Sequence, residues 1–160
     1  MDRVDRILAQ WHRERPDLDV SAMGLLGRLS RLSTHIGREI EKTFAERGIS
    51  ASSFDVLATL RRSGPPYRLS PGELLDTTMV SSGTMTNRID QLEKAGLVER
   101  IANPEDRRSV IIALTEEGRR RVDEAATAHV ANQHRVVAEL SPEERATLDR
   151  LLRKYLAAFE

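Results

Sequence analysis

The chain has 160 residues, of which 39% are hydrophobic and 31% charged, and its acidic and basic side chains cancel to a formal net charge of zero. The length predicts one domain, or one domain with helical extensions, and the composition predicts a folded chain rather than a disordered one. The absence of cysteine excludes disulfides, thiolate metal sites and cysteine redox sensing. No apolar run reaches the roughly 18 to 20 residues that span a bilayer. Because the N-terminus also lacks an apolar signal core, we expect a cytoplasmic protein with no membrane partner.

The N-terminal third is expected to be helical. Apolar residues at helical spacing predict a short amphipathic helix over residues 3–14. A longer helix is predicted from a cap at Ser21 to a stop at Gly48, and a third over residues 50–62, before a Gly-Pro-Pro break. The longer helix carries an apolar stripe, formed by Leu25, Leu29, Leu32, Ile36, Ile40 and Phe44.

The middle of the chain has the order of a helix-turn-helix with a β-hairpin wing. A serine, a proline and a glutamate at capping-box spacing predict a short helix over residues 71–76. After a polar turn, a second helix is predicted from a cap at Ser81 to Ala95, with Gly96 ending it. Strands follow over residues 97–102 and 110–114, and a short strand over 67–69 precedes the unit. Such a unit places one helix in the major groove of DNA.

The helix from Ser81 to Ala95 has two chemically different sides. Met85, Ile89 and Leu92 recur at helical spacing and predict a buried stripe. The opposite side offers short hydrogen-bonding groups and Asp90, as reading base edges requires. An ordinary solvated helix face is the alternative interpretation. The predicted DNA-contacting residues on this helix are Ser82, Thr84, Thr86, Asn87 and Gln91.

The loop over residues 103–109 is the second indication of DNA binding. Arg107 and Arg108 lie near the expected hairpin tip, where arginines can enter a minor groove. Asp106 could hold one of them by an ion pair. A solvated charged turn is the alternative, and the zero net charge argues mildly against DNA binding, because DNA-binding domains are usually basic.

The C-terminal part is predicted to form two more helices, one from Thr115 to about Leu140 and one that starts at a second serine–proline–glutamate cap at Ser141. The last helix has an apolar face, formed by Leu148, Leu151, Leu152, Tyr155, Leu156 and Phe159. The terminal helices together bear more apolar surface than a small winged domain could cover. They therefore call for a partner, unless they fold back on their own protomer.

Three segments in this order resemble the MarR family of winged helix-turn-helix regulators: VSSGTMTNRIDQLEKAGLVER, NPEDRRS and VIIALTEEG. The resemblance implies a mostly α fold with a small β-hairpin wing, an intertwined helical homodimer and a palindromic DNA operator. Residues 1–20 would form an extra N-terminal helix and residues 21–160 the family domain. Within that domain, the DNA-binding core would span about 50–115 and the dimerisation helices 21–48 and 116–160. The expected function is a sequence-specific repressor.

A finer resemblance is to the PecS-like, urate-responsive branch. It implies a ligand site at Trp11, Asp55, Arg88 and Arg100. A planar anion could stack on Trp11, take a bidentate bond from Arg88 and compete with Asp55 for that arginine, which would move the recognition helix. TamR-like members of the branch respond instead to citrate or aconitate-type carboxylates, and the sequence does not choose between them. Trp11 as interface packing and Asp55–Arg88 as a structural ion pair are the alternatives.

Other functions receive less support from the sequence. No nucleophile–base cluster or phosphate loop is found, so we expect neither an enzyme nor a cofactor. His129 and His134 are five residues apart, which does not place them side by side on a helix, so no metal site is expected. A pH-responsive or ligand-independent regulator is an alternative, because two symmetry-related copies of His35 could repel when protonated. A winged-helix protein adaptor is a more distant alternative.

Overall fold

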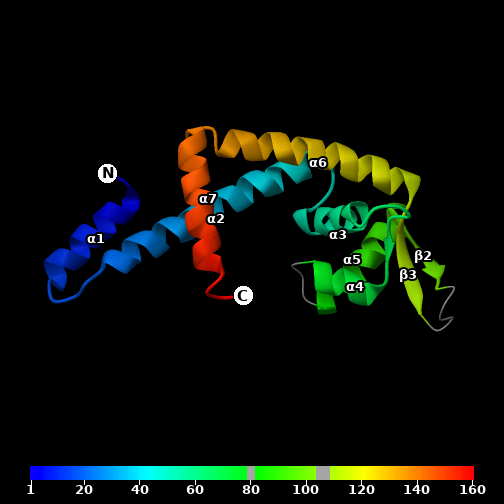
Figure 1. Cartoon of the computed structure of the whole chain (residues 1–160), viewed down its shortest axis with the longest axis horizontal. Coiled ribbons are helices and arrows are strands. Elements are labelled where there is room, and N and C mark those ends of the chain that lie inside the picture. Colours follow the sequence, from blue (N-terminus) through cyan, green and yellow to red (C-terminus); the bar gives the residue numbers. More distant parts are fainter. Residues whose placement is uncertain (79–81, 104–108) are drawn as a thin grey trace. The chain divides into compact units, whose positions relative to one another are not determined.

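The computed structural model describes residues 1–78, 82–103 and 109–160, with the side chains of 82–84 excepted. These residues form two compact units, Met1–Glu39 and Ile40–Glu160. The elements, in chain order (Figure 1), are α1 (Arg3–Glu14), α2 (Ser21–Ala45), α3 (Ala51–Arg62), β1 (Arg68–Leu69), α4 (Pro71–Thr77), α5 (Ser82–Lys94), β2 (Val98–Ala102), β3 (Val110–Leu114), α6 (Glu116–Val136) and α7 (Pro142–Leu156). Among the described residues, no helix combines the length and the apolar character needed to cross a bilayer.

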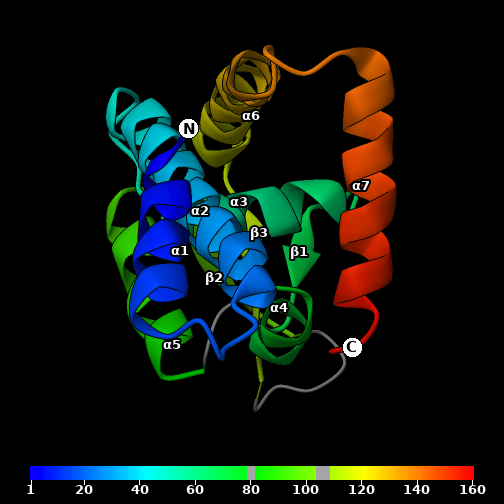
Figure 2. The ribbon, with the colours of Figure 1, turned by 90° about the vertical axis from the view of Figure 1, so that its left-hand side faces the viewer.

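The first unit is a helical hairpin in which α1 runs alongside the first part of α2 (Figure 2). Arg28 of α2 donates hydrogen bonds to Asp2, the N-cap of α1, and to Asp5 in its first turn. The two helices approach closely at Gly24. A Cβ atom at this position would lie only 3.1 Å from the Cδ1 atom of Leu8. Gly24 therefore allows the close approach, and the Arg28 contacts join the start of α1 to α2.

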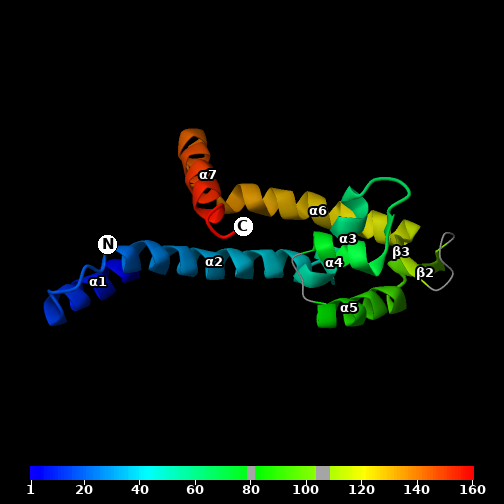
Figure 3. The ribbon, with the colours of Figure 1, turned by 60° about the horizontal axis from the view of Figure 1, so that its bottom comes forward.

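The second unit packs α3, α4, α5 and α6 around a small antiparallel sheet with strand order β1-β3-β2. Figure 3 shows α5 beside α3 and α4, with the strands β2 and β3 beyond its C-terminal end. In the register of the sheet, Arg100 of β2 lies opposite Ile112 of β3. The core consists of fully or almost fully buried apolar residues: Val56, Leu57, Leu60, Leu74, Met85, Ile89, Leu92, Leu97, Val98, Ile112 and Val122.

The predicted fold class, mostly α with a small β wing, is confirmed. The predicted stops at Gly48 and Gly96 have the expected left-handed backbone, with φ of 66° and 70°. The predicted cap at Ser21 is wrong, because Ser21 is the first residue of α2 and its N–H donates to the Asp19 side chain. Helix α6 also ends earlier than predicted, at Val136.

Two helices keep large apolar faces uncovered in the single chain. Helix α7 has no buried residue, and the apolar stripe of α2 is mostly exposed up to its last turn. Apolar surface of this extent on an isolated chain marks an interaction site. The most exposed apolar residues of these two helices are Leu25, Leu26, Leu32, Leu151 and Leu156, and Phe159, just after α7, is exposed as well.

Candidate nucleic-acid interface

Helix α5 is anchored by one side and open on the other. Met85, Ile89 and Leu92 are at most 3% exposed and seat the helix in the core. Thr86, Asn87 and Gln91 are exposed on the other side. The first three residues are therefore buried and the other three exposed, as the sequence predicts. The side chains of Ser82 and Thr84, which are also predicted to contact DNA, lie outside the described ones.

Helix α4, which precedes α5, is fixed at both ends by polar contacts. At its start, the backbone N–H of Ser70 donates to Glu73 Oε2 (2.7 Å) and the N–H of Glu73 donates to Ser70 Oγ (3.2 Å), as the capping box predicts. The bond from the Ser70 backbone lowers the pKa of the Glu73 carboxyl. At its end, Arg62 Nη2 of α3 donates to the Thr77 carbonyl oxygen (2.6 Å). These contacts hold the first helix of the helix-turn-helix on the scaffold.

Helix α5 is joined to the wing by a charged contact. Arg100 of β2 donates from Nη1 to Glu93 Oε2 and from Nη2 to Asp90 Oδ1, and both carboxylates lie on α5. Its backbone N–H also donates to Glu93 Oε1 (3.3 Å). The hydrogen bond to Asp90 raises the pKa of the Arg100 guanidinium above its ordinary value. Asp90, placed by the sequence on the DNA-facing side of α5, instead faces the wing strand.

The ends of the wing loop are closed by Asn103 and Ser109. The Asn103 N–H donates to the Ser109 carbonyl oxygen (3.2 Å), and the Asn103 side-chain amide donates to Ser109 Oγ (2.9 Å). The predicted minor-groove residues Arg107 and Arg108, with Asp106, lie within 104–108, outside the described residues.

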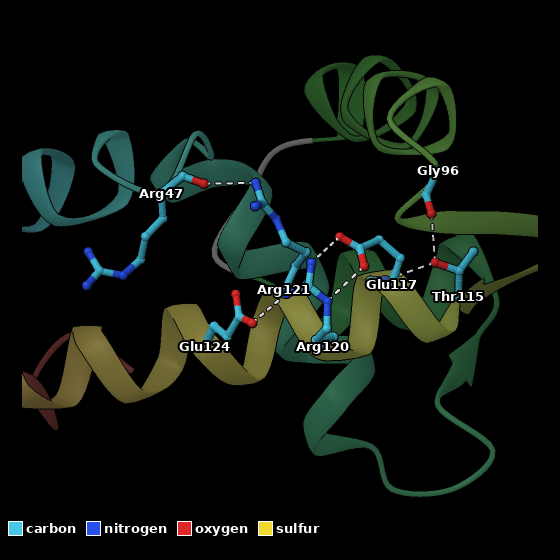
Figure 4. A network of polar contacts seen from close by, with 8 residues as sticks. Arg47, Gly96, Thr115, Glu117, Arg120, Arg121 and Glu124 are labelled. Carbon is cyan, nitrogen blue, oxygen red and sulfur yellow. Dashed lines mark hydrogen bonds and ion pairs between the residues drawn. The ribbon is translucent and has the colours of Figure 1, made fainter.

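The start of α6 is attached to the base of the wing (Figure 4). Thr115, the N-cap of α6, donates from Oγ1 to the carbonyl oxygen of Gly96 (2.7 Å) and accepts from the N–H of Gly118 (2.9 Å). One turn further on, Arg121 Nη2 donates to the carbonyl oxygen of Arg47 (2.9 Å). Helix α6 is therefore fixed both to the end of α5 and to the segment between α2 and α3.

The residues predicted to hold a ligand fall in both units. Trp11 lies on α1 in the first unit and is 39% exposed. Asp55 and Arg88 are half-buried on α3 and α5 of the second unit. The expected Asp55–Arg88 ion pair is not formed within the described part of the chain. Instead, Arg88 Nη1 is buried without a hydrogen-bond partner, and Arg100 is engaged by two carboxylates.

The histidines form no metal site within the described ranges, which contain no group of three His, Cys, Asp or Glu side chains placed to hold an ion. His129 stacks on Phe44 with ring centroids 5.0 Å apart, and burial lowers the pKa of its imidazole. His129 thus packs as a core aromatic residue where α6 meets the end of α2.

Comparison with known proteins agrees with this geometry. The sequence matches the MarR family over residues 49–110. It is 44% identical to the HTH-type transcriptional regulator PecS of Dickeya dadantii over 149 residues, which are 93% of this chain and 90% of that protein. The chain belongs to the MarR family. The identity with PecS over most of both proteins supports the PecS-like branch within it.

Solved structures of MarR-family proteins have the same fold. A mutant MarR of E. coli complexed with operator DNA is 28% identical and has a TM-score of 0.72, covering 91% of this chain and 97% of that one. BpsR of Bordetella bronchiseptica, whose DNA binding is regulated by 6-hydroxynicotinic acid, is 27% identical with a TM-score of 0.72, covering 86% and 95%. This MarR-family chain is a DNA-binding transcription regulator and not an enzyme.

Sequence reasoning about this MarR-family chain missed two contacts. The first is the contact of Arg100 with α5. Its only signal in the sequence was a pair of carboxylates three residues apart on one helix, with an arginine on the strand that follows. The second is the close approach at Gly118, where a Cβ atom would lie 1.8 Å from the Leu97 carbonyl oxygen. A glycine among the charged residues at the start of a helix was the available signal.

Proposed function

We propose that the chain acts as a homodimeric repressor that reads a palindromic operator with α5. The observation that carries this proposal is the exposed hydrogen-bonding side of α5, where Asn87 and Gln91 are suited to adenine edges. Arg107 and Arg108 would enter the flanking minor groove, and Ser82, Thr84 and Thr86 would contact bases or phosphates. Salt-dependent binding to a palindromic duplex from upstream of the encoding gene tests the proposal. A protein adaptor would not bind that duplex.

The homodimer is supported by the uncovered apolar faces of α2 and α7. Burying a leucine side chain contributes about 1.5 to 3 kcal/mol, and each contact occurs twice in a two-fold interface. A two-fold dimer would also present two copies of α5 to the two halves of a palindromic site. The dimerisation helices would be those over residues 21–48 and 116–160.

Replacing Leu152 with glutamate, in the middle of the α7 apolar face, is expected to raise the dimer dissociation constant at least about a hundredfold. The reason is that two leucines are lost from the interface and two charges are placed there. Analytical ultracentrifugation over a concentration series measures the effect. Arg150→Glu, on the polar side of the same helix, is the control and should leave the dimer intact. A Leu152→Glu protein that dimerises like the parent contradicts the proposed interface.

Release of the DNA by a small anionic ligand, similar to urate or to citrate and aconitate, is the second part of the proposal. The ligand residues would be Trp11, Asp55, Arg88 and Arg100. The buried, unpartnered Nη1 atom of Arg88 supports this, because a buried donor without an acceptor is costly and a ligand anion would supply the acceptor. Regulation of BpsR by 6-hydroxynicotinic acid shows that a structural relative responds to a small aromatic acid.

Titrating the protein–operator complex with urate and with citrate is expected to release the DNA with one of them. Trp11→Ala should weaken that release at least about tenfold while leaving operator affinity unchanged, because loss of stacking removes a ligand contact outside the DNA-reading helix. Arg88→Gln should weaken the release as well. If neither anion acts, the effector proposal fails. Release by acid that disappears in His35→Asn would then favour the pH-responsive alternative.

A further inference from the structure

We propose that Arg100 is a positioning residue for DNA recognition, which sets the orientation of α5 by holding Asp90 and Glu93 from the wing strand. The inference rests on the proposed role of α5 in reading DNA. It goes beyond that role because it assigns these three residues a function in which none of them contacts a base.

The first support is that Arg100 is itself held in place. It lies in the middle of β2, opposite Ile112 of β3, and Ile112 is fully buried. Its guanidinium reaches two different carboxylates on α5, and its backbone N–H bonds one of them again. A planar guanidinium with two separate acceptors fixes direction as well as distance. The Arg100 side chain is 29% exposed, which makes it less exposed than either carboxylate.

The second support is that the apolar contacts of α5 do not fix the rotation of the helix about its own axis. Burial of Met85, Ile89 and Leu92 fixes the depth of the helix, but hydrophobic contacts are non-directional. Since side chains end about 5 to 6 Å from a helix axis, a rotation of about 10° moves their ends by about 1 Å. That shift is large compared with the distance range of a hydrogen bond. The Arg100 contact opposes this rotation.

The third support is the place of the carboxylates along α5. Asp90 follows Ile89 of the buried stripe and precedes Gln91 of the exposed side, and it lies one turn after Asn87. A contact at Asp90 therefore acts at the boundary between the buried and the exposed sides. Because α5 turns as one body, a contact that opposes its rotation at Asp90 also opposes a shift of the Asn87 and Gln91 side chains.

Arg100→Gln tests the proposal, with affinity measured on the operator duplex and on a non-specific duplex of the same length. Operator affinity should fall at least tenfold, and non-specific affinity should change less than about threefold, because phosphate contacts tolerate a small rotation of the helix. Exchanging the pair, Arg100→Glu with Glu93→Arg, keeps the net charge and should restore operator affinity to within about threefold of the parent. Equal loss on both duplexes, or no rescue by the exchange, overturns the positioning role.

Two further variants exclude simpler explanations. Arg120→Gln removes an arginine that also pairs with two carboxylates, Glu117 and Glu124, but within α6 alone (Figure 4), and it should change operator affinity less than about twofold. A triple variant that adds Asp90→Asn and Glu93→Gln to Arg100→Gln neutralises the carboxylates that have lost their partner, and its operator affinity should stay low. Recovery of affinity there would mean that Arg100 only screens negative charge, and would overturn the proposal.

The failure of this inference can be told from failure of the proposed function. If Asn87→Ala leaves operator binding unchanged, α5 does not read the DNA and the proposed function fails. If Asn87→Ala weakens binding while Arg100→Gln does not, the reading helix stands and the positioning role alone is wrong. Should Arg100→Gln not fold, the charge exchange with Glu93 still tests the contact on its own.

Discussion

Replacing Asn87 and Gln91 together with alanine is expected to weaken operator binding by about 2 to 6 kcal/mol in each half-site, a factor of roughly 30 or more per half-site. Both side chains are exposed on α5, and a side-chain amide can donate to and accept from an adenine edge at the same time. Because the amides are neutral, the loss should be confined to the specific site. Non-specific affinity and the slope of affinity against salt concentration should stay those of the parent.

Fluorescence anisotropy on operator and non-specific duplexes at several salt concentrations measures both quantities. Gln10→Ala, an exposed amide on α1, is the matched control and should leave operator affinity unchanged. If the double variant lost affinity equally on both duplexes, the side chains would contact phosphates rather than bases. If it bound the operator like the parent, base reading by α5 would be wrong.

Features set by neighbours in the sequence were predictable. The spacing of Met85, Ile89 and Leu92 gives the buried side of α5, because helical periodicity is a local property. The capping box at Ser70 and the stop at Gly96 follow from backbone chemistry within a few residues. For this reason the winged helix-turn-helix could be placed from the sequence nearly residue by residue.

Features that depend on packing between elements were not predictable in the same way. Helical periodicity gives the direction of each side chain around the helix axis, and on that basis Asp90 belongs with the DNA-facing residues. It does not show that β2 lies next to α5 in that direction. Among the described residues, Asp55 and Arg88 form no ion pair, because adjacent helices bring residues near each other without setting their side-chain directions. The minor-groove role of Arg107 and Arg108 stays a prediction.

Replacing Gly118 with alanine is expected to be among the most destabilising single changes in the chain. The added Cβ atom would lie 1.8 Å from the carbonyl oxygen of Leu97 and 2.8 Å from its carbonyl carbon, and these backbone atoms cannot turn aside as a side chain could. The same carbonyl oxygen accepts from the N–H of Thr115 (3.2 Å), so moving it also breaks a hydrogen bond. Overpacking costs about 1 to 3 kcal/mol where neighbours can shift, and we expect a loss of about 3 kcal/mol or more here.

Urea unfolding at fixed protein concentration measures the effect, since the stability of a dimer depends on concentration. Gly72→Ala in α4 is the matched control, because the nearest atom to its Cβ would be 3.9 Å away. It should raise the free energy of unfolding by about 0.4 to 1 kcal/mol. The glycine-to-alanine substitution should thus lower the free energy of unfolding at Gly118 and raise it at Gly72, although both glycines lie in helices. A Gly118→Ala protein as stable as the parent would show that α6 does not start against Leu97, and the attachment of α6 to the base of the wing would be wrong with it.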